Sequence, residues 1–386
     1  MNKENGVNDR SQMRIMIIGP AQSIHVERWI NYLSSHSIKL LVVSEIPPIL
    51  EVEGVEYRYL PFPRLPRLLR YGLGYFLVKR ASYVFEPDAV QVHSLGTNAI
   101  LALSVPRQKL IITPWGSDIA ILKGRSLRRH LVQTVARRSR LILTTSEKMK
   151  IDINALFGIS SAKIKVISWG INTIRFRPNQ GAFEKRKERK KWDIPEDAFV
   201  FLSNRTTSIT YRTSEIVEAF LDSLELRANS QLIVIGGFMP ANAEAGRAQE
   251  GYKMAVAKLA LKSNGRVRII NQELKSEEMA SLLRAADAVV SVPKSDQRSS
   301  SVLEAIASGG QVILSDIAPN REVETDGAHV VVVKEPLKMN LASVMAKIQV
   351  IESANAASNR EFIDRHESWE SQAAKILQVY ETIKLQ

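Results

Sequence analysis

Residues Asp287–Asp316 read DAVVSVPKSDQRSSSVLEAIASGGQVILSD, and this is the most informative stretch of the chain. Its first apolar run predicts a buried strand that ends at Pro293, and a polar loop follows at 294–300. A helix is expected to begin at about Ser300–Ser301 and to stop at Gly309–Gly310, where the next strand starts. This order of strand, helix and strand indicates a parallel sheet with helices packed on its faces.

The loop and the helix bring two carboxylates and a helix start to the carboxyl end of one strand. Asp296 lies in the loop, and Glu304 lies in the first turns of the helix. The first N–H groups of a helix lack partners and carry partial positive charge, so the amides of Ser299, Ser300 and Ser301 suit a phosphate group. The spacing leaves another interpretation open, in which a serine only caps the helix and Glu304 only complements its dipole.

Short apolar runs alternate with helical patterns along most of the chain. Two series of strands are expected, at 14–19, 40–44, 89–93, 109–113, 141–146 and 163–168, and at 199–203, 231–236, 267–270, 288–292, 311–315 and 330–333. The alternation predicts an α/β fold with two Rossmann-like domains, whose parallel sheets are buried on both faces. Ligands bind beyond the carboxyl ends of such strands, so we expect both domains to face one cleft.

The length of 386 residues fits two domains, and the charge pattern suggests where they divide. We expect a disordered tail at 1–12, an N-terminal domain at 13–178, a charged linker at 179–197 and a C-terminal domain at 198–358. A helix at 359–386 is expected to return to the N-terminal domain.

The composition excludes several classes of protein. Apolar residues make up 45% of the chain and charged residues 24%, which is typical of a soluble globular protein. The absence of cysteine excludes disulfides, thiolate metal sites and cysteine nucleophiles. No Asp-x-Asp or His/carboxylate spacing suggests a metal site, and the longest uncharged stretch, 89–106, is interrupted by too many polar residues to span a membrane.

The positive charge is concentrated in the first half of the chain. Residues 1–178 hold 26 Lys/Arg against 12 Asp/Glu, a net +14, whereas residues 179–386 hold 27 against 28, a net −1. This asymmetry suggests an anionic partner, which could be nucleic acid, an anionic membrane surface or an acidic acceptor, unless the charge serves only solubility.

Two basic segments, Pro63–Arg80 and Lys123–Arg140, carry much of this charge. In Pro63–Arg80 the basic residues alternate with leucine and aromatic side chains, which suits a segment that lies in a membrane interface. The alternative is that these apolar side chains pack into the core. The protein is expected to be cytoplasmic, with peripheral binding at the inner face of the cell membrane as one possibility.

The carboxylate spacing in 287–316 resembles a known signature. It is similar to the acidic motif of family 4 (group 1) retaining glycosyltransferases of the GT-B fold, in which Glu, seven residues and Glu precede a helix of small residues and a glycine. Here the motif reads Asp296, seven residues, Glu304 and then AIASGG. The resemblance implies that Glu304 holds the donor ribose and that Asp296 lies beside the transferred sugar, with a shorter reach than the family's glutamate.

Four further segments are similar to the same family, in the same order along the chain. They are Gly19–Arg28 (GPAQSIHVER), Glu86–His93 (EPDAVQVH), Thr113–Asp118 (TPWGSD) and Val166–Pro178 (VISWGINTIRFRP). Many members have histidine at the position of Trp115. The resemblance implies an acceptor or cleft role for Gly19, Ser23, His25, His93, Trp115 and Asp118.

One departure from the family concerns the donor diphosphate. Members usually place an arginine and then a lysine after the first strand of the C-terminal domain. Arg205 matches the arginine, but the lysine position falls on Tyr211, with Arg212 beside it. Arg212 could supply the missing charge, because its guanidinium fork suits phosphate, or it could be a surface residue.

The resemblance implies a retaining glycosyltransferase that needs no metal ion. Its donor would be a nucleoside-diphosphate sugar bound by the C-terminal domain, and its acceptor a glycan, a lipid-linked molecule or another compound bound by the N-terminal domain. Helix amides and arginines would stabilise the leaving diphosphate. Two alternatives are a nucleotide-sugar epimerase on the same fold and a non-catalytic protein that binds an anionic polymer. Nucleic acid is not an expected partner, because no RNA-binding or recognition-helix motif is present.

Overall fold

The chain forms two units in a computed structural model, which describes residues 12–60, 66–120, 127–237 and 243–385. Unit 1 runs up to Trp169 and resumes at Ala373, and unit 2 is Gly170–Gln372. The division therefore falls before residue 178, and the expected linker at 179–197 belongs to unit 2. Apart from Gln12, the tail expected at 1–12 lies outside the described residues.

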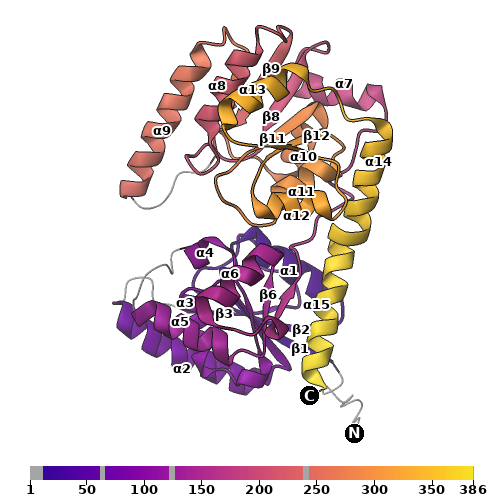
Figure 1. Cartoon of the computed structure of the whole chain (residues 1–386). Helices are drawn as coiled ribbons and strands as arrows, with labels where there is room; N and C mark the ends of the chain where they lie inside the picture. The colour runs from indigo at the N-terminus through magenta and orange to yellow at the C-terminus, as the bar shows by residue number, and fades with distance from the viewer. Residues whose placement is uncertain (1–11, 61–65, 121–126, 238–242, 386) are drawn as a thin grey trace. The chain divides into compact units, whose positions relative to one another are not determined.

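Within the described residues, unit 1 contains a seven-stranded parallel sheet in the order β3-β2-β1-β4-β5-β6-β7 (Figure 1). Its strands are β1 (Arg14–Ile18), β2 (Lys39–Ser44), β3 (Glu56–Tyr59), β4 (Ala89–His93), β5 (Leu110–Thr113), β6 (Leu141–Thr144) and β7 (Ile164–Val166). Six of them were expected from the sequence to within two residues at either end. The seventh, β3, was missed because it is an edge strand of sequence EYRY with little burial.

Helices enclose this sheet on both faces (Figure 1). They are α1 (Ile24–Ser34), α2 (Arg67–Phe85), α3 (Thr97–Leu101), α4 (Ser117–Ala120), α5 (Leu127–Arg138) and α6 (Glu147–Phe157), with short turns η1 (Ala102–Ser104), η2 (Arg107–Lys109) and η3 (Ser161–Lys163). Strand β1 shows the two-sided burial: Met16 and Ile18 enter the core under α2, α3, α5 and α6, and Ile15 and Ile17 enter the core on the other face, beside α1.

The C-terminal helix α15 (Trp369–Lys384) completes unit 1 from Ala373 onward, so the end of the chain returns to this unit as the sequence predicted. The single helix expected at 359–386 is wrong in its bounds, because the chain turns at 363–368 and residues up to Gln372 belong to unit 2. Ile376, Val379 and Tyr380 pack into the core that also holds Ile15 and Ile17. The Tyr380 hydroxyl donates a hydrogen bond to Gln91 of β4, so the helix is fastened to the centre of the sheet.

Unit 2 holds a six-stranded parallel sheet in its described residues, in the order β10-β9-β8-β11-β12-β13. The strands are β8 (Phe199–Ser203), β9 (Ser230–Ile235), β10 (Val267–Ile270), β11 (Ala288–Ser291), β12 (Gln311–Ser315) and β13 (Val331–Val333). The helices are α7 (Ala182–Lys191), α8 (Thr213–Ser223), α9 (Ala243–Leu261), α10 (Ser276–Ala285), α11 (Ser300–Ala307), α12 (Ala318–Thr325), α13 (Leu337–Lys347) and α14 (Ser353–Phe362), followed by a π-helical turn, η4 (Ile363–Glu367). The two sheets confirm the predicted α/β fold with two Rossmann-like domains.

The charged segment that suggested a linker is a packed part of unit 2. It contains helix α7, whose Arg189 is 5% exposed and ion-pairs with Asp287 at 2.6 Å. Asp287 also accepts a hydrogen bond from the backbone N–H of Val200 at 2.7 Å. Because a buried charge is stable only when it is paired, this contact fixes α7 against the start of β11.

A helix that crosses a bilayer needs about 20 mostly apolar residues, and this requirement applies to each helix that the structure describes. None of these helices is both long enough and apolar enough to cross a membrane.

Candidate functional site

The predicted donor residues of unit 2 meet where β8 and β11 end. These two strands are parallel neighbours, with Ala288 opposite Phe201, so the residues that follow them share one edge of the sheet. Arg205 ion-pairs with Asp296 at 2.9 Å and donates a hydrogen bond to the Ser299 hydroxyl. The structure therefore brings together three of the residues that the sequence singled out.

Tyr211 holds the other side of the Arg205 guanidinium. Its hydroxyl accepts a hydrogen bond from Arg205 Nη2 at 2.5 Å, and the arginine Cζ lies 4.1 Å from the centre of its ring. The sequence suggested that tyrosine at this position only removes a charge. Instead the ring orients the remaining cation through a cation–π contact, a contribution that the aromatic residue type could have signalled.

The start of helix α11 is open. Ser299 is the N-cap residue, but its side chain makes no capping hydrogen bond and accepts from Arg205 instead. Among the described residues, no acceptor bonds to the amides of Ser300 and Ser301, while Asn204 donates to the Ser301 carbonyl at 2.8 Å. Unpaired amides beside a guanidinium form a site that suits an anion with several oxygens.

Glu304 lies within α11 and is only 9% exposed. Its immediate neighbours Leu303 and Ala305 are buried in the core of unit 2. A carboxylate that only complemented the helix dipole would gain nothing from this burial, since burial disfavours its charge. The depth of Glu304 therefore favours a binding role over a purely electrostatic one.

Arg212 does not join Arg205. It begins α8 with a left-handed backbone, φ 55°, and its guanidinium bonds to Glu335 at 2.6 Å and to Glu215 at 3.0 Å. These two carboxylates offset its charge, and Arg212 is 9% exposed. The structure thus gives Arg212 two carboxylate partners, whereas Arg205 lies beside the open start of α11 and is paired there with Asp296.

Arg298 is a residue of this loop that sequence reasoning missed. It is 7% exposed, and its guanidinium ion-pairs with Asp326 at 2.5 Å and with Glu367 at 2.7 Å. Glu367 precedes Ser368, which forms a parallel bridge with Ile171. Loop 294–300 is therefore anchored to the place where the chain enters and leaves unit 2. The sequence could not indicate this role of Arg298, because its partners lie far away along the chain.

In unit 1 the strands β1, β4 and β5 end side by side, and close packing there requires a glycine. A Cβ atom at Gly19 would lie 2.9 Å from the Cβ of His93, closer than real Cβ contacts. Gly19 follows β1 and His93 ends β4, so the missing side chain lets the two loops approach.

Four aromatic rings gather at these strand ends. The Trp169 ring stacks on His25 with 4.7 Å between centroids and on His93 with 6.1 Å, while Trp115 contacts all three edge-on. His25, His93 and Trp115 were expected from the sequence, but Trp169 was noted only as a departure from the family. The available signal for a role of Trp169 was a large aromatic residue at the end of the first unit.

Four polar ring atoms of this aromatic cluster have no hydrogen-bond partner among the described residues. These atoms are Nδ1 of His25, both ring nitrogens of His93 and Nε1 of Trp115, and all are buried. Burial lowers the pKa of His93 from 6.5 to about 3, and burial together with the Arg28 charge lowers the pKa of His25 to about 4. Both rings are therefore neutral near pH 7, and a hydroxyl-bearing ligand could complete their hydrogen bonds.

Asp118 and Ser23 support the cluster. Asp118 accepts backbone hydrogen bonds from Leu95 at 2.6 Å and from Trp115 at 3.0 Å, which ties the loop after β4 to the loop after β5. Burial raises the pKa of Asp118, and the backbone donors oppose this shift. Ser23 caps α1 by accepting from the His25 amide at 3.3 Å. Both residues thus fix the position of the rings.

The two half-sites suit different ligands. The Arg205 cluster of unit 2 can hold a diphosphate through one guanidinium and two free amides, and the aromatic cluster of unit 1 can hold a neutral, hydroxylated molecule. In the part of the chain that the structure describes, no three histidine, aspartate or glutamate side chains are placed to share a metal ion.

Both halves of the chain match models of glycosyltransferase families. Residues 22–175 match the model described as Glycosyltransferase Family 4, and residues 184–369 match the model described as Glycosyl transferases group 1. Among curated proteins, none matches the sequence significantly.

Solved structures with the same fold cover the whole of both units. Sucrose-phosphate synthase from Thermosynechococcus elongatus is 16% identical, with a TM-score of 0.76 over 96% of this chain and 99% of that one. HepE from Anabaena, solved with UDP and glucose, is 14% identical, with a TM-score of 0.77 over 96% and 100%. WaaG, described as a glycosyltransferase of lipopolysaccharide biosynthesis, is 16% identical, with a TM-score of 0.70 over 96% and 99%. At these identities the likeness shows the fold alone, which is GT-B.

The neutral state of His93 leads to a prediction about pH. In the unfolded chain this ring binds a proton below pH 6.5, whereas in the folded chain its pKa is about 3. Its contribution to stability is therefore complete above 6.5 and is lost as the pH falls towards 3. Between about pH 7 and pH 5, wild type should lose about 2 kcal/mol more unfolding free energy than His93→Phe, which keeps a ring without the titration.

Urea titrations at the two pH values measure this difference. The matched control is His130→Phe, which changes an exposed ring of α5 and should follow wild type. Equal pH sensitivity in wild type and His93→Phe would show that His93 does not stay neutral in the folded chain.

Proposed function

The chain belongs to the family 4 (group 1) glycosyltransferases, and we propose that it moves a sugar from a nucleoside-diphosphate sugar to a glycan, a lipid-linked molecule or another hydroxylated acceptor, with retention of anomeric configuration. The observation that carries the proposal is the cluster of Arg205, Asp296 and Ser299 at the open start of α11. The neighbouring structures solved with UDP or UDP-glucose support a donor of this class.

The donor diphosphate is held by unit 2 in this proposal. Negative charge develops on the diphosphate as the bond to the sugar breaks, so fixed donors aimed at it stabilise the transition state. Arg205 and the amides of Ser300 and Ser301 are the available donors. Glu304 accepts hydrogen bonds from the ribose hydroxyls, and Asp296 lies at the sugar.

The proposed retention is supported by the ion pair of Asp296, which argues against a covalent intermediate on this carboxylate. A carboxylate paired with Arg205 at 2.9 Å is a weak nucleophile, because the guanidinium stabilises its charge. In the proposed retaining reaction, the acceptor hydroxyl attacks the anomeric carbon from the side on which the diphosphate departs. The bond from carbon to the acceptor oxygen forms as the bond to the phosphate oxygen breaks, and the hydroxyl proton passes to that phosphate oxygen.

The acceptor is held by unit 1, at the aromatic cluster of His25, His93, Trp115 and Trp169. Trp115 and Trp169 are partly exposed, and an indole face suits the apolar face of a sugar ring. The neutral histidines offer one donor and one acceptor each, which fits hydroxyl groups and not charged ones. Asp118 keeps Trp115 in place through its backbone amide.

Glu304→Gln should lower turnover roughly tenfold to a hundredfold, because a charge-assisted hydrogen bond is worth about 1.5–3 kcal/mol. The substitution keeps the shape of a side chain that is 9% exposed, so the fold should persist. Glu273→Gln, on the surface of unit 2, is the matched control.

Transfer is measured by mass spectrometry with donors selected by thermal shift from a panel of nucleotide sugars. Incubation with each donor alone would detect epimerisation as a separate activity. Full turnover in Glu304→Gln, with the donor still bound as in wild type, would remove Glu304 from the site.

The two arginines should differ in their effect on diphosphate binding. We keep Arg212 as a proposed donor-binding residue, but two carboxylates offset its charge, whereas Arg205 is paired with Asp296 and contacts the N-cap residue of α11, so Arg212 should contribute less than Arg205. Arg205→Ala should weaken binding of the nucleoside diphosphate at least tenfold, or about 1.5 kcal/mol, and Arg212→Ala less. Calorimetry checks both, and the reverse order would show that Arg212 replaces the family lysine.

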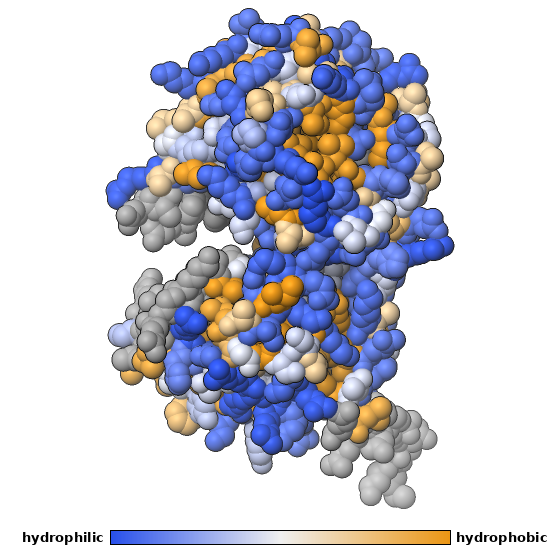
Figure 2. Space-filling model, viewed as in Figure 1, coloured by the Kyte–Doolittle hydropathy of each residue, from blue (hydrophilic) through white to orange (hydrophobic). Residues whose placement is uncertain are grey.

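We further propose that helix α2 of unit 1 binds an anionic membrane surface. One face of the helix exposes Leu69, Leu73, Phe76 and Tyr83, at 56, 43, 66 and 82%, whereas Val78 is buried in the core. Figure 2 shows apolar side chains among hydrophilic ones at the surface of the part of unit 1 that carries α2 in Figure 1. The spacing of the exposed residues repeats with the turns of the helix, so they form one stripe.

Basic residues flank this stripe and supply charge complementarity to anionic lipid. Lys79 and Arg80 are exposed, while Arg70 is paired with Glu45 at 2.7 Å. Each surface cation is worth about 1 kcal/mol near anionic lipid, so several hold a protein reversibly. Arg64, Lys123 and Arg125 of the two basic segments lie outside the described residues.

Leu73→Gln/Phe76→Gln should reduce sedimentation with anionic vesicles about tenfold or more at low salt, because each inserted side chain contributes about 1.5–3 kcal/mol. The matched control is Met254→Gln/Leu261→Gln, which changes two residues of α9 that are 63 and 80% exposed. Raised salt should weaken binding of wild type. Failure of wild type to sediment with anionic vesicles at low salt would refute the membrane role.

A further inference from the structure

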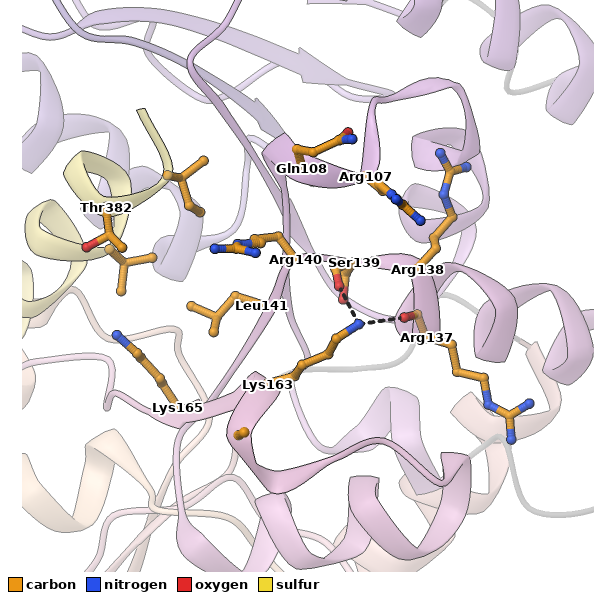
Figure 3. A pocket seen from close by; sticks show the side chains of 13 residues that line it. Arg107, Gln108, Arg137, Arg138, Ser139, Arg140, Leu141, Lys163, Lys165 and Thr382 are labelled. Carbon is orange, nitrogen blue, oxygen red and sulfur yellow. Dashed lines mark hydrogen bonds between the residues drawn. The ribbon is translucent and has the colours of Figure 1, made fainter. Parts of the chain in front are cut away.

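A positively charged hollow lies where strands β5, β6 and β7 begin. It has a volume of about 600 Å³, and Figure 3 shows the side chains that line it. Six of the lining residues are cations: Arg107, Arg137, Arg138, Arg140, Lys163 and Lys165. None of the described residues around the hollow is an acid. The volume falls in the usual range for a ligand site, roughly 300–1,000 Å³.

Three of the six cations are held by backbone carbonyl groups. Arg137 donates to the carbonyl of Phe157 at 2.8 Å, Arg138 to that of Val105 at 2.9 Å, and Lys163 to that of Arg137 itself at 3.1 Å. A carbonyl oxygen orients a cation but carries no full charge, so the positive charge of these three groups is not neutralised.

The side chains of the other three cations, Arg107, Arg140 and Lys165, make no hydrogen bond or ion pair with any described residue. All three are exposed. In Figure 3 the side chains of Arg140 and Lys165 extend towards the helix that carries Thr382, and Arg107 and Arg138 lie at the other end of the hollow. Cations gathered in one concavity repel each other, and an anion that enters it removes this repulsion.

The hollow is separate from the acceptor half-site of unit 1. His93 and Trp115 lie at the carboxyl ends of β4 and β5, whereas Arg107, Arg140 and Lys163 precede or begin β5, β6 and β7. The hollow therefore lies at the amino ends of the strands and the aromatic cluster at their carboxyl ends, on opposite sides of the same parallel sheet. The charged residues come from three separate segments, which are η2, the end of α5 with the residues after it, and η3 with β7. Solvated charges on one helix face therefore do not explain them.

We propose that this hollow binds a multiply charged phosphate group. Guanidinium forks match the oxygens of phosphate, and two of the three unpaired cations are arginines. Leu141, Val379 and Ile383 add an apolar wall, which suits a phosphate that carries an organic substituent. Such a group belongs to an anionic lipid headgroup or to a free soluble phosphate, and the chemistry of the site is the same for both. The inference does not rest on the proposed transfer reaction.

Calorimetry with inorganic pyrophosphate tests the site. The measurements use the full chain with Arg205→Ala, which removes the cation proposed to bind a diphosphate in unit 2. In this background pyrophosphate should still bind, and adding Arg140→Gln/Lys165→Gln should weaken it roughly tenfold or more. These two side chains have no partners to lose, and their removal relieves repulsion among the cations, so the melting temperature should not fall.

The matched control removes two charges from elsewhere in the chain. Lys187→Gln/Arg247→Gln changes exposed residues of α7 and α9 in unit 2 and should bind pyrophosphate as the parent does. Equal binding in the control and in Arg140→Gln/Lys165→Gln would overturn the proposal for a soluble phosphate. Arg107→Gln alone should also weaken binding, which supports the site independently of the double variant.

Vesicles distinguish the two sources of phosphate. Sedimentation is compared for phosphatidylcholine vesicles with and without phosphatidic acid, with Leu73→Gln/Phe76→Gln added to every variant so that α2 does not bind the vesicles. A loss of binding to phosphatidic acid in Arg140→Gln/Lys165→Gln, but not in the control, identifies a lipid headgroup, whereas a loss confined to pyrophosphate identifies a soluble ligand. If neither pyrophosphate nor phosphatidic acid distinguishes this variant from the control, the hollow is not a phosphate site.

Discussion

The parallel register of β8 and β11 is the constraint on which the Arg205 cluster depends. Ala288 lies opposite Phe201 and Val289 opposite Leu202, so the chain leaves both strands at one edge. Arg205 and Asp296 follow these strands by a few residues and can therefore meet at 2.9 Å. A slip of one residue would turn every side chain of the strand to the other face, so burial on both sides fixes the contact as firmly as the charges do.

The alternation of apolar runs was enough to predict the two sheets, because parallel strands buried on both faces have a strong local signal. The same pattern gave a wrong prediction where an element is held in place by contacts that are distant in sequence. Helix α7 has the sequence of a solvated linker, and only the pairing of Arg189 with Asp287, 98 residues away, makes it part of unit 2. Strand β3 was missed for another reason, because an edge strand with exposed side chains has no apolar pattern to detect.

The candidate site shows the same division. The sequence identified Arg205, Asp296 and Ser299 because residue type and spacing carry their chemistry, but it could not identify their partners. The engagement of Arg212 with Glu335 spans 123 residues, and that of Arg298 with Glu367 depends on a turn at the end of the fold. These contacts are formed by the tertiary structure, and they decide which of several similar cations lies at the open start of α11.

The distribution of ion pairs gives the charge asymmetry of the sequence a physical meaning. In unit 2, buried cations such as Arg189 and Arg298 face carboxylates, so their charges cancel locally. In unit 1, Arg137, Arg138 and Lys163 are oriented by neutral carbonyls, which satisfy their hydrogen bonds and leave their charge in place. These three cations therefore have their hydrogen bonds satisfied while their positive charge is not neutralised. The field that remains attracts anions over roughly a Debye length of about 8 Å at physiological salt, and the concave surface at β5–β7 concentrates it where Arg107, Arg140 and Lys165 are unpaired.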